Sequence, residues 1–305
     1  MGVLITGASG FLGTHLVEHL TASGQSVHAL LRPTSVPRWD KSLPIKTCMF
    51  EGNTDDLNRY LKAHSIQTII HTASTFKHTA LPSEIDGLIQ SNIHFGTHLL
   101  EACKETQVEW FINTGSSWQH YEDHEYSAVN LYAATKEAFD AILKFYTDST
   151  QLKSVTLKLF DTYGPRDQRR KIISILREQL GRPEHLAMSS GDQLLDLCHI
   201  HDVARAYAHV LELISQKQTS AIAGKSFGVS SGERVSLKEL AILIEQITQK
   251  KLRLDWGARP LREREVITPW SHFTALPGWS PLMGLRERMR EFLLASGPDA
   301  SFKQE

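Results

Sequence analysis

The sequence has 305 residues, of which 41% are hydrophobic and 22% are charged, as is ordinary for a soluble globular protein. Its 33 basic and 34 acidic side chains nearly cancel, so no polycationic face for a nucleic-acid or anionic-membrane partner is expected, and only a local basic pocket for a phosphorylated ligand is compatible with this balance. No signal-peptide core precedes the first apolar run, and no run approaches the ~20 residues of a membrane helix. A cytoplasmic location is therefore expected.

Short apolar runs alternate with helical segments along the first part of the chain, which predicts an α/β fold with a doubly wound parallel sheet. Strands are predicted at residues 3–6, 26–31, 45–51, 68–71, 110–113 and 154–159, and helices at 10–23, 55–64, 91–106 and 131–147. The pattern changes after Gly164-Pro165. We therefore expect a dinucleotide-binding domain, residues 1–165, and a smaller C-terminal substrate lobe, residues 166–305, with some exchange of chain between them. Helices of this lobe are predicted at 170–180, 203–215 and 237–249, the second with Asp202 as its N-cap.

A glycine-rich motif, Gly7-Ala8-Ser9-Gly10-Phe11-Leu12-Gly13, follows the first strand and opens the first helix. Glycine lets the chain turn sharply and lets backbone N–H groups approach a pyrophosphate, while the helix N-terminus adds about half a unit of positive charge. In this position the motif predicts a Rossmann-type dinucleotide site. The cofactor contacts expected from it are Gly7, Ser9, Gly10, Phe11, Leu12 and Gly13.

The end of the second strand indicates which dinucleotide is bound. An acidic residue there would hold the ribose 2′-hydroxyl of NAD, but this strand ends in Arg32. A guanidinium suits a 2′-phosphate in charge and in geometry, so NADP(H) is favoured over NAD. The alternative is a solvated surface arginine.

A Tyr-x-x-x-Lys motif, Tyr132 to Lys136, lies on the predicted helix 131–147. Four residues make about one turn, so the phenol and the ammonium share a face. A neighbouring cation lowers the pKa of a phenol, which otherwise titrates too high for acid–base catalysis at neutral pH. The motif alone is common by chance, and its weight comes from following a nucleotide loop. A hydroxyl at the end of the preceding strand would complete the site, with Ser116 as first choice and Ser117 as the alternative.

Together these residues resemble the extended short-chain dehydrogenase/reductase family, the NAD-dependent epimerase/dehydratase group, over nearly the whole chain. The resemblance implies an oxidoreductase that acts on a nucleotide-activated sugar and forms a homodimer through helices 91–106 and 131–147. It implies further cofactor contacts from Asn53, Thr72, Ala73, Ser74, Asn92 and Phe160, besides Tyr132 and Lys136. Asn53 stands where the family usually has an aspartate near the adenine, and Asn92 matches the asparagine that supports the active site.

The stretch that begins at Phe160 resembles the family's connection to the sugar-nucleotide site. Asp161 stands where the family usually has asparagine, and Thr162 where it has an apolar residue. A carboxylate would repel a phosphate, so direct phosphate contact by Asp161 is doubtful. Arg262 is the expected diphosphate clamp, or else a solvated arginine. Trp118, Gln119 and His120, just past Ser116, are expected to contact the sugar or only to shape its loop, and Ser117 is a further expected substrate contact.

The absence of residues that other branches of the family need for catalysis narrows the reactions expected of this chain. The 4,6-dehydratases carry an acidic pair where this chain has Ser116-Ser117-Trp118, and combined epimerase–reductases carry a cysteine just beyond the serine. A 4-ketoreductase or a 4-epimerase remains. Short local similarities most resemble the CDP-abequose and CDP-paratose synthase branch, which uses NADPH to reduce a CDP-linked 4-keto-3,6-dideoxyhexose for surface polysaccharide such as lipopolysaccharide O-antigen.

The favoured hypothesis is therefore an NADPH-dependent 4-ketoreductase. In it Tyr132 donates a proton to the C4 oxygen, Ser116 hydrogen-bonds that oxygen, and Lys136 positions the cofactor and tunes Tyr132. The alternatives are an NAD-dependent 4-epimerase using the same pair and a non-catalytic cofactor-sensing protein of the same fold.

Cysteine and histidine spacing predicts no metal site. Cys48, Cys103 and Cys198 are far apart and are expected to be reduced thiols. The densest histidine cluster, which comprises His71, His78, His94 and His98, lacks an accompanying pattern of carboxylates or cysteines.

Overall fold

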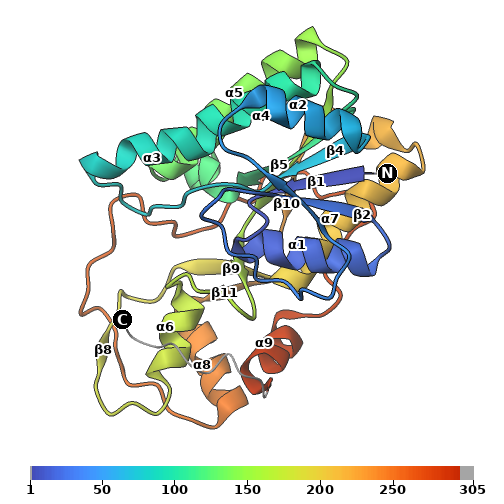
Figure 1. Cartoon of the computed structure of the whole chain (residues 1–305). Helices are drawn as coiled ribbons and strands as arrows, with labels where there is room; N and C mark the ends of the chain where they lie inside the picture. Colours follow the sequence, from blue (N-terminus) through green and yellow to red (C-terminus); the bar gives the residue numbers. More distant parts are fainter. Residues whose placement is uncertain (1, 296–305) are drawn as a thin grey trace.

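The structure, a computed structural model, describes residues 2–295 and is built around a seven-stranded sheet (Figure 1). The strand order is β10-β6-β5-β4-β1-β2-β3, and every neighbouring pair is parallel. The strands are β1 (Gly2–Thr6), β2 (Ser26–Leu31), β3 (Lys46–Met49), β4 (Ile66–His71), β5 (Trp110–Ser116), β6 (Lys153–Leu159) and β10 (Lys225–Val229). The predicted doubly wound α/β fold is confirmed.

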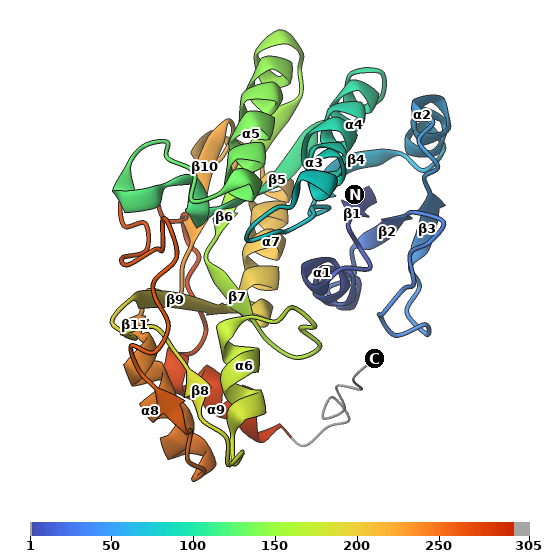
Figure 2. The same ribbon diagram turned by 90° about the vertical axis from the view of Figure 1, so that its left-hand side faces the viewer.

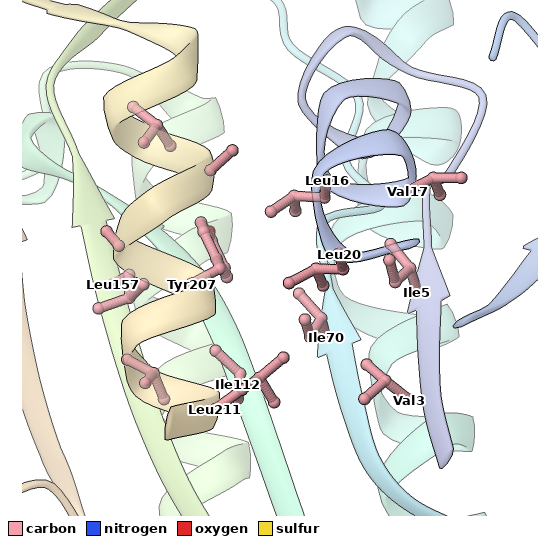
Figure 3. Close-up of a cluster of buried hydrophobic side chains, with 14 of the residues drawn as sticks. Val3, Ile5, Leu16, Val17, Leu20, Ile70, Ile112, Leu157, Tyr207 and Leu211 are labelled. Atoms are coloured by element: carbon pink, nitrogen blue, oxygen red, sulfur yellow. The ribbon is translucent and has the colours of Figure 1, made fainter. Parts of the chain in front are cut away.

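Helices cover both faces of this sheet (Figure 1). On one face α1 (Phe11–Ala22) packs against α7 (Ile200–Ser215), and on the other lie α2 (Thr54–Ala63), α4 (Phe95–Lys104) and α5 (Leu131–Ser149). Between the sheet and the α1/α7 layer, Leu16 and Leu20 approach Ile70, while Tyr207 and Leu211 lie over the neighbouring strands (Figure 3).

Burial on both faces explains why β1, β2, β4 and the start of β5 are mostly apolar. Val3 and Ile5 belong to the core beneath α1 and α7, whereas Leu4 between them belongs to the core beneath α2, α4 and α5. A strand that is covered on both sides has no solvent-facing positions to fill with polar residues. The apolar runs therefore predicted the positions of these strands without any alternation.

A smaller lobe lies beyond the carboxyl ends of the strands (Figure 2). Its short sheets contain β7 (Asp161–Tyr163), β9 (Leu194–His199) and β11 (Arg234–Ser236), and β8 (Leu186–Ala187) with β12 (Leu254–Asp255). Its helices are α6 (Ile172–Gln179), α8 (Leu237–Thr248) and α9 (Leu285–Leu294). The chain does not divide cleanly at residue 165, because α7 and β10 lie beyond it in sequence and belong to the large layered domain. None of the helices within residues 2–295 combines the length and the apolarity that crossing a membrane requires.

Two predicted helices differ in detail from the structure. The segment predicted as 91–106 is preceded by α3 (Ile85–Ile89) and begins with a π-helical turn, Gln90–His94. The prediction that Asp202 caps α7 was wrong. His199 is the N-cap, and its Nδ1 accepts a hydrogen bond from the backbone of His201 at 3.3 Å. Asp202 lies in the first turn because its carboxylate is bound to Arg288.

The Asp202–Arg288 ion pair joins α7 to α9 and so connects the two lobes. Arg288 donates to the carboxylate through Nε at 2.9 Å and through Nη2 at 3.1 Å, and the backbone of Leu282 donates at 3.0 Å. Both side chains are buried. Burial alone would raise the pKa of Asp202, but the hydrogen bonds from Arg288 and Leu282 hold it below its usual value.

We expect Arg288→Met to lower the free energy of unfolding by roughly 3 kcal/mol, because it removes the principal cation from a buried carboxylate. Urea denaturation followed by circular dichroism measures the change. The double variant Asp202→Asn/Arg288→Met is expected to recover part of the loss. Unchanged stability in Arg288→Met would contradict the assignment of this pair as the connection between the lobes.

Candidate active site

The glycine loop between β1 and α1 packs too closely to carry side chains at two positions. Gly7 has a φ of 63°, and a Cβ there would lie 2.6 Å from the backbone nitrogen of Ala73. A Cβ on Gly13 would lie 2.1 Å from the carbonyl oxygen of Gly7. Glycine is therefore required at both positions for α1 and the loop after β4 to approach β1.

The first turn of α1 fits an anionic ligand. Its N-cap, Gly10, has an extended backbone, and no side chain of the described residues caps the helix. The amides of this turn thus lack the partners that a capping side chain would supply, and the helix dipole favours negative charge there. An uncapped end beside a glycine turn fits the pyrophosphate of a dinucleotide. In the same turn Leu12 packs against the core, while Ser9 and Phe11 are half-buried.

The loop after β4 is held against the glycine loop and α5 by hydrogen bonds. Thr72 donates to the carbonyl of Thr6 at 2.7 Å, and the buried Asn92 binds the stretch that follows. Asn92 Oδ1 accepts from the hydroxyl of Ser74 and from the backbone of Thr75, and its Nδ2 donates to the carbonyl of Thr75 and to the hydroxyl of Thr135 at 2.9 Å. This asparagine therefore ties the cofactor-side loop to the helix that carries Tyr132 and Lys136.

Arg32 and Asn53 are predicted to contact the adenosine end of the cofactor, and they differ in whether their side chains already have hydrogen-bond partners. Arg32 follows β2 and is exposed, and its guanidinium makes no hydrogen bond or ion pair with any other described residue. It is free to bind a phosphate. Asn53 is the N-cap of α2, and its Oδ1 accepts from the backbone of Asp55 at 2.9 Å. The side-chain carbonyl of Asn53 is thus already used by the helix.

Tyr132 and the hydroxyl of Ser116 come together although 16 residues separate them. Ser116 ends β5, Tyr132 lies in the first turn of α5, and the hydroxyls of Ser74 and Ser116 are close enough to the phenol to lower its pKa. Burial raises the pKa of Tyr132 to about 12, against the opposing charge of Arg169 and these two hydroxyls. The phenol is therefore protonated at neutral pH and can act as an acid. Ser117 lies buried in the next 3-10 turn, Ser117–Gln119.

Lys136 is buried one helical turn from Tyr132. Its Nζ lies 6.0 Å from the centroid of the tyrosine ring. Burial lowers the pKa of Lys136 to about 8, and the charge of Asp140, one turn further along α5, opposes that shift. Asp140 therefore helps to keep the ammonium charged.

Gln119, predicted as a sugar contact, is turned into the protein instead. It is 0% exposed, and its Oε1 accepts from the backbone of Ser116 at 2.8 Å. Its Nε2 donates to the carboxylates of Glu137 at 2.6 Å and Asp140 at 2.9 Å. Both polar atoms of the amide are engaged, so Gln119 positions the end of β5 against α5 rather than contacting a sugar.

Aromatic rings stand beside Tyr132. Phe76 meets the Tyr132 ring edge to face at a centroid distance of 5.0 Å and lies 5.6 Å from the Trp118 ring, which in turn lies 5.6 Å from His78. Phe76 is 40% exposed. Phe76 therefore lies in contact with both the Tyr132 ring and the Trp118 ring. Sequence reasoning missed Phe76, because a lone aromatic in a loop carries no pattern.

In the smaller lobe, Asp161 and Thr162 line a small open pocket together with Lys171. Lys171 Nζ lies 3.4 Å from the Asp161 carboxylate. The ammonium of Lys171 partly neutralises the Asp161 carboxylate, so Asp161 would repel a nearby phosphate less. The Thr162 hydroxyl donates to the carbonyl of Phe160, whose buried ring packs on Phe273.

Arg262 lies in an exposed loop, with its Nε 4.0 Å from a carboxylate oxygen of Glu265. Burial lowers the pKa of His78, and the charge of Arg262 lowers it further. Arg262 is thus near His78 and, through it, near Trp118. The structure brings it to the same side as the predicted sugar contacts.

The part of the chain that the structure describes contains no group of three or more histidine, cysteine, aspartate or glutamate side chains arranged to hold a metal ion. Cys48, Cys103 and Cys198 are free and buried. Burial raises the pKa of Cys48 to about 11 and that of the other two thiols further. These cysteines therefore pack as small apolar residues.

A glycine loop, an uncapped helix and a Tyr–Lys pair beside a strand-end serine together match a known family. The model of the NAD dependent epimerase/dehydratase family matches residues 3–223. The chain belongs to this family. Members of the family use a nicotinamide dinucleotide as cofactor.

Relatives span nearly the whole chain. The CDP-abequose synthase of Salmonella muenchen is 28% identical over 295 residues, which cover 95% of this chain and 96% of that protein. Among solved structures, MoeE5 in complex with UDP-glucuronic acid and NAD has a TM-score of 0.79 at 24% identity, covering 96% of this chain and 98% of its own. The UDP-glucose 4-epimerase of Thermotoga maritima has a TM-score of 0.82 at 20% identity, covering 96% and 97%.

We expect kcat/KM to fall as the pH rises through about 8, because Lys136 loses its proton there in the free enzyme. Asp140→Asn removes the charge that supports the ammonium, so the falling limb is expected to move to lower pH. Asp148→Asn, an exposed position on the same helix, is the matched control and should leave the limb unchanged. A limb that does not respond to Asp140→Asn would contradict the coupling of these two residues.

Proposed function

We propose that this chain is an NADPH-dependent reductase of the C4 keto group of a nucleotide-activated deoxysugar, of the CDP-4-keto-3,6-dideoxyhexose kind. The observation that carries the proposal is the protonated Tyr132 phenol, which lies near the Ser116 hydroxyl and has the Nζ of the buried Lys136 6.0 Å from its ring centroid. This group has the parts that proton delivery to a carbonyl oxygen requires. The similarity to CDP-abequose synthases over 95% of the chain supports the substrate class.

In the proposed reaction a bound nicotinamide supplies the hydride to C4. Tyr132 gives its proton to the oxygen as negative charge develops there, and Ser116 donates a hydrogen bond to the same oxygen. Lys136 holds the dinucleotide by its ribose hydroxyls and keeps positive charge beside the phenol. Phe76 and Trp118 offer apolar faces next to Tyr132, which suit a sugar that lacks hydroxyl groups.

The cofactor preference rests on Arg32. Its exposed guanidinium has no partner among residues 2–295 and follows the strand end where the ribose of the adenosine is bound in Rossmann folds. A 2′-phosphate would supply that partner through charge-assisted hydrogen bonds. We therefore propose NADP(H) over NAD, with Asn53 and the glycine loop completing the adenosine side.

An NAD-dependent 4-epimerase is the second candidate, favoured by neighbours of similar fold such as a UDP-glucose 4-epimerase in complex with NAD. An epimerase retains its dinucleotide and regenerates it in each turnover, whereas a reductase consumes NADPH. The two functions are therefore distinguished by whether NADPH is consumed in proportion to the product formed.

The test is NADPH consumption against CDP-, dTDP-, GDP- and UDP-linked 4-keto sugars, with NADH in parallel. A CDP-linked 4-keto deoxysugar is expected to be reduced, faster with NADPH. Tyr132→Phe is expected to lower kcat by about 10²–10⁴-fold while cofactor binding persists. Equal rates with NADH would refute the role of Arg32. Protein that interconverts C4 epimers with tightly bound NAD would replace the reductase with the epimerase, and cofactor binding without turnover would point to a sensor.

We also propose the homodimer predicted for helices 91–106 and 131–147, and we extend its surface to α3, which directly precedes the first of these segments. Leu131 and Phe145 on α5 are 40% and 63% exposed, and Ile85 and Ile89 on α3 are exposed as well. Apolar side chains gathered on neighbouring helices are typical of a surface that a second subunit covers. Light scattering at micromolar concentration is expected to give twice the chain mass, and Phe145→Glu is expected to give the monomer mass. A monomer in the unmodified protein would refute the dimer.

A further inference from the structure

The segment between β7 and α6, residues 164–171, carries four cations and one carboxylate. It loops out toward α1 (Figure 2). Arg166 holds it there by donating to both carboxylate oxygens of Glu18 on α1, from Nη1 at 2.9 Å and from Nη2 at 2.6 Å. This basic segment therefore belongs to the smaller lobe by sequence but packs on the helix that follows the glycine loop.

Within the segment, Arg169 lies over the start of α1. Its guanidinium carbon is 4.4 Å from the centroid of the Phe11 ring. Phe11 is the first residue of α1, directly after the uncapped Gly10. A cation beside the positive end of a helix is unfavourable by itself, and it becomes favourable when an anion binds between the two. The arrangement is thus complementary to a phosphate.

Arg169 also keeps donors free for such a ligand. Its Nε and Nη2 each donate to the carboxylate of Asp167 at 2.7 Å, and Nη2 donates to the carbonyl of Thr162 at 3.1 Å. A guanidinium has five N–H groups. The two on Nη1 make no hydrogen bond with any residue in the described part of the chain. A phosphate oxygen can therefore bind Nη1 while the Asp167 pair holds the side chain in place.

Two further observations indicate which phosphate this is. The charge of Arg169 reaches the Tyr132 phenol, so the guanidinium is near both the glycine loop and the catalytic residue. A dinucleotide bound at α1 runs between these two points, with its pyrophosphate at the helix. In contrast, the pocket in the smaller lobe is lined by Asp161, Lys171 and Asp167 and not by Arg169 itself.

We propose that Arg169 binds a phosphate of the nicotinamide dinucleotide through Nη1, so that the basic segment after β7 forms part of the cofactor site. The proposal rests on the proposed function in so far as the chain must bind this dinucleotide. It requires neither a particular sugar nor NADP in preference to NAD.

The test measures ligand binding to the substrate-free protein, by NADPH fluorescence and by calorimetry with 2′-phospho-ADP-ribose and adenosine 2′-monophosphate. Arg169→Met is expected to weaken NADPH and 2′-phospho-ADP-ribose by about tenfold or more, the order of one charge-assisted hydrogen bond. Binding of the monophosphate, which has no diphosphate, is expected to stay within twofold. Arg170→Met removes the same charge from the adjacent exposed position and is expected to change none of the three by more than twofold.

A second variant gives a change of opposite sign that misfolding cannot mimic. Asp167→Asn removes the negative charge next to the proposed phosphate; its one side-chain oxygen keeps one of the two hydrogen bonds from Arg169 and the other is lost. It is expected to tighten NADPH binding by about twofold to fivefold, since like charges near a ligand disfavour it.

Unchanged NADPH affinity in Arg169→Met would overturn the proposal, as would equal losses in Arg169→Met and Arg170→Met. An increase confined to the KM of the sugar would assign Arg169 to the substrate's diphosphate instead. If the unmodified protein bound none of the dinucleotide probes, the proposed function would fail together with this inference. Intact binding in the unmodified protein with no effect of Arg169→Met overturns the inference alone.

Discussion

Two buried side-chain amides hold α5, the helix that carries Tyr132 and Lys136, in position. Gln119 connects the backbone of Ser116 at the end of β5 to carboxylates on α5, and Asn92 connects the loop after β4 to Thr135 on the same helix. Each amide is hydrogen-bonded on both its oxygen and its nitrogen, and a buried amide that loses a partner costs free energy. The angle at which α5 meets the sheet is thus constrained from two sides. The distance between the Tyr132 phenol and the Ser116 hydroxyl follows from that constraint.

The electrostatics of the site act on two groups in opposite directions. Burial favours the neutral form of both Tyr132 and Lys136, so it raises one pKa and lowers the other. Burial thus favours a phenol that holds its proton and an amine that loses its charge. Arg169 and Asp140 each oppose the shift of one partner, and both come from outside the Tyr-x-x-x-Lys motif. The pKa values of Tyr132 and Lys136 therefore depend also on charges that the motif itself does not contain.

The sequence predicted the parts of the fold and site that depend on local pattern. Apolar runs located the strands, and the glycine motif located the turn into α1, because the positive φ of Gly7 and the close approach of Gly13 to the Gly7 carbonyl arise within one strand–turn–helix unit. Side-chain direction was not predictable in the same way. Gln119 turns inward because Glu137 and Asp140 meet it from α5, and Asp202 leaves the cap of α7 because Arg288, 86 residues later, binds it. Arg169 belonged to a visible run of cations after Gly164-Pro165, but only the packing of that run on α1 singles it out.

The late position of β10 in the sequence affects how the chain folds during its synthesis. β10 pairs in parallel with β6 and comes from residues 225–229, whereas β6 comes from residues 153–159. While a ribosome synthesises the intervening residues, the edge of β6 has no neighbour on that side, and Val155 and Leu157 lie in an unpaired, apolar strand. Such an edge is a template for pairing with another chain. The large domain thus completes its sheet late, by a long-range contact of the kind that slows folding and prolongs exposure to aggregation. A nascent chain released before residue 225 would keep that edge open permanently.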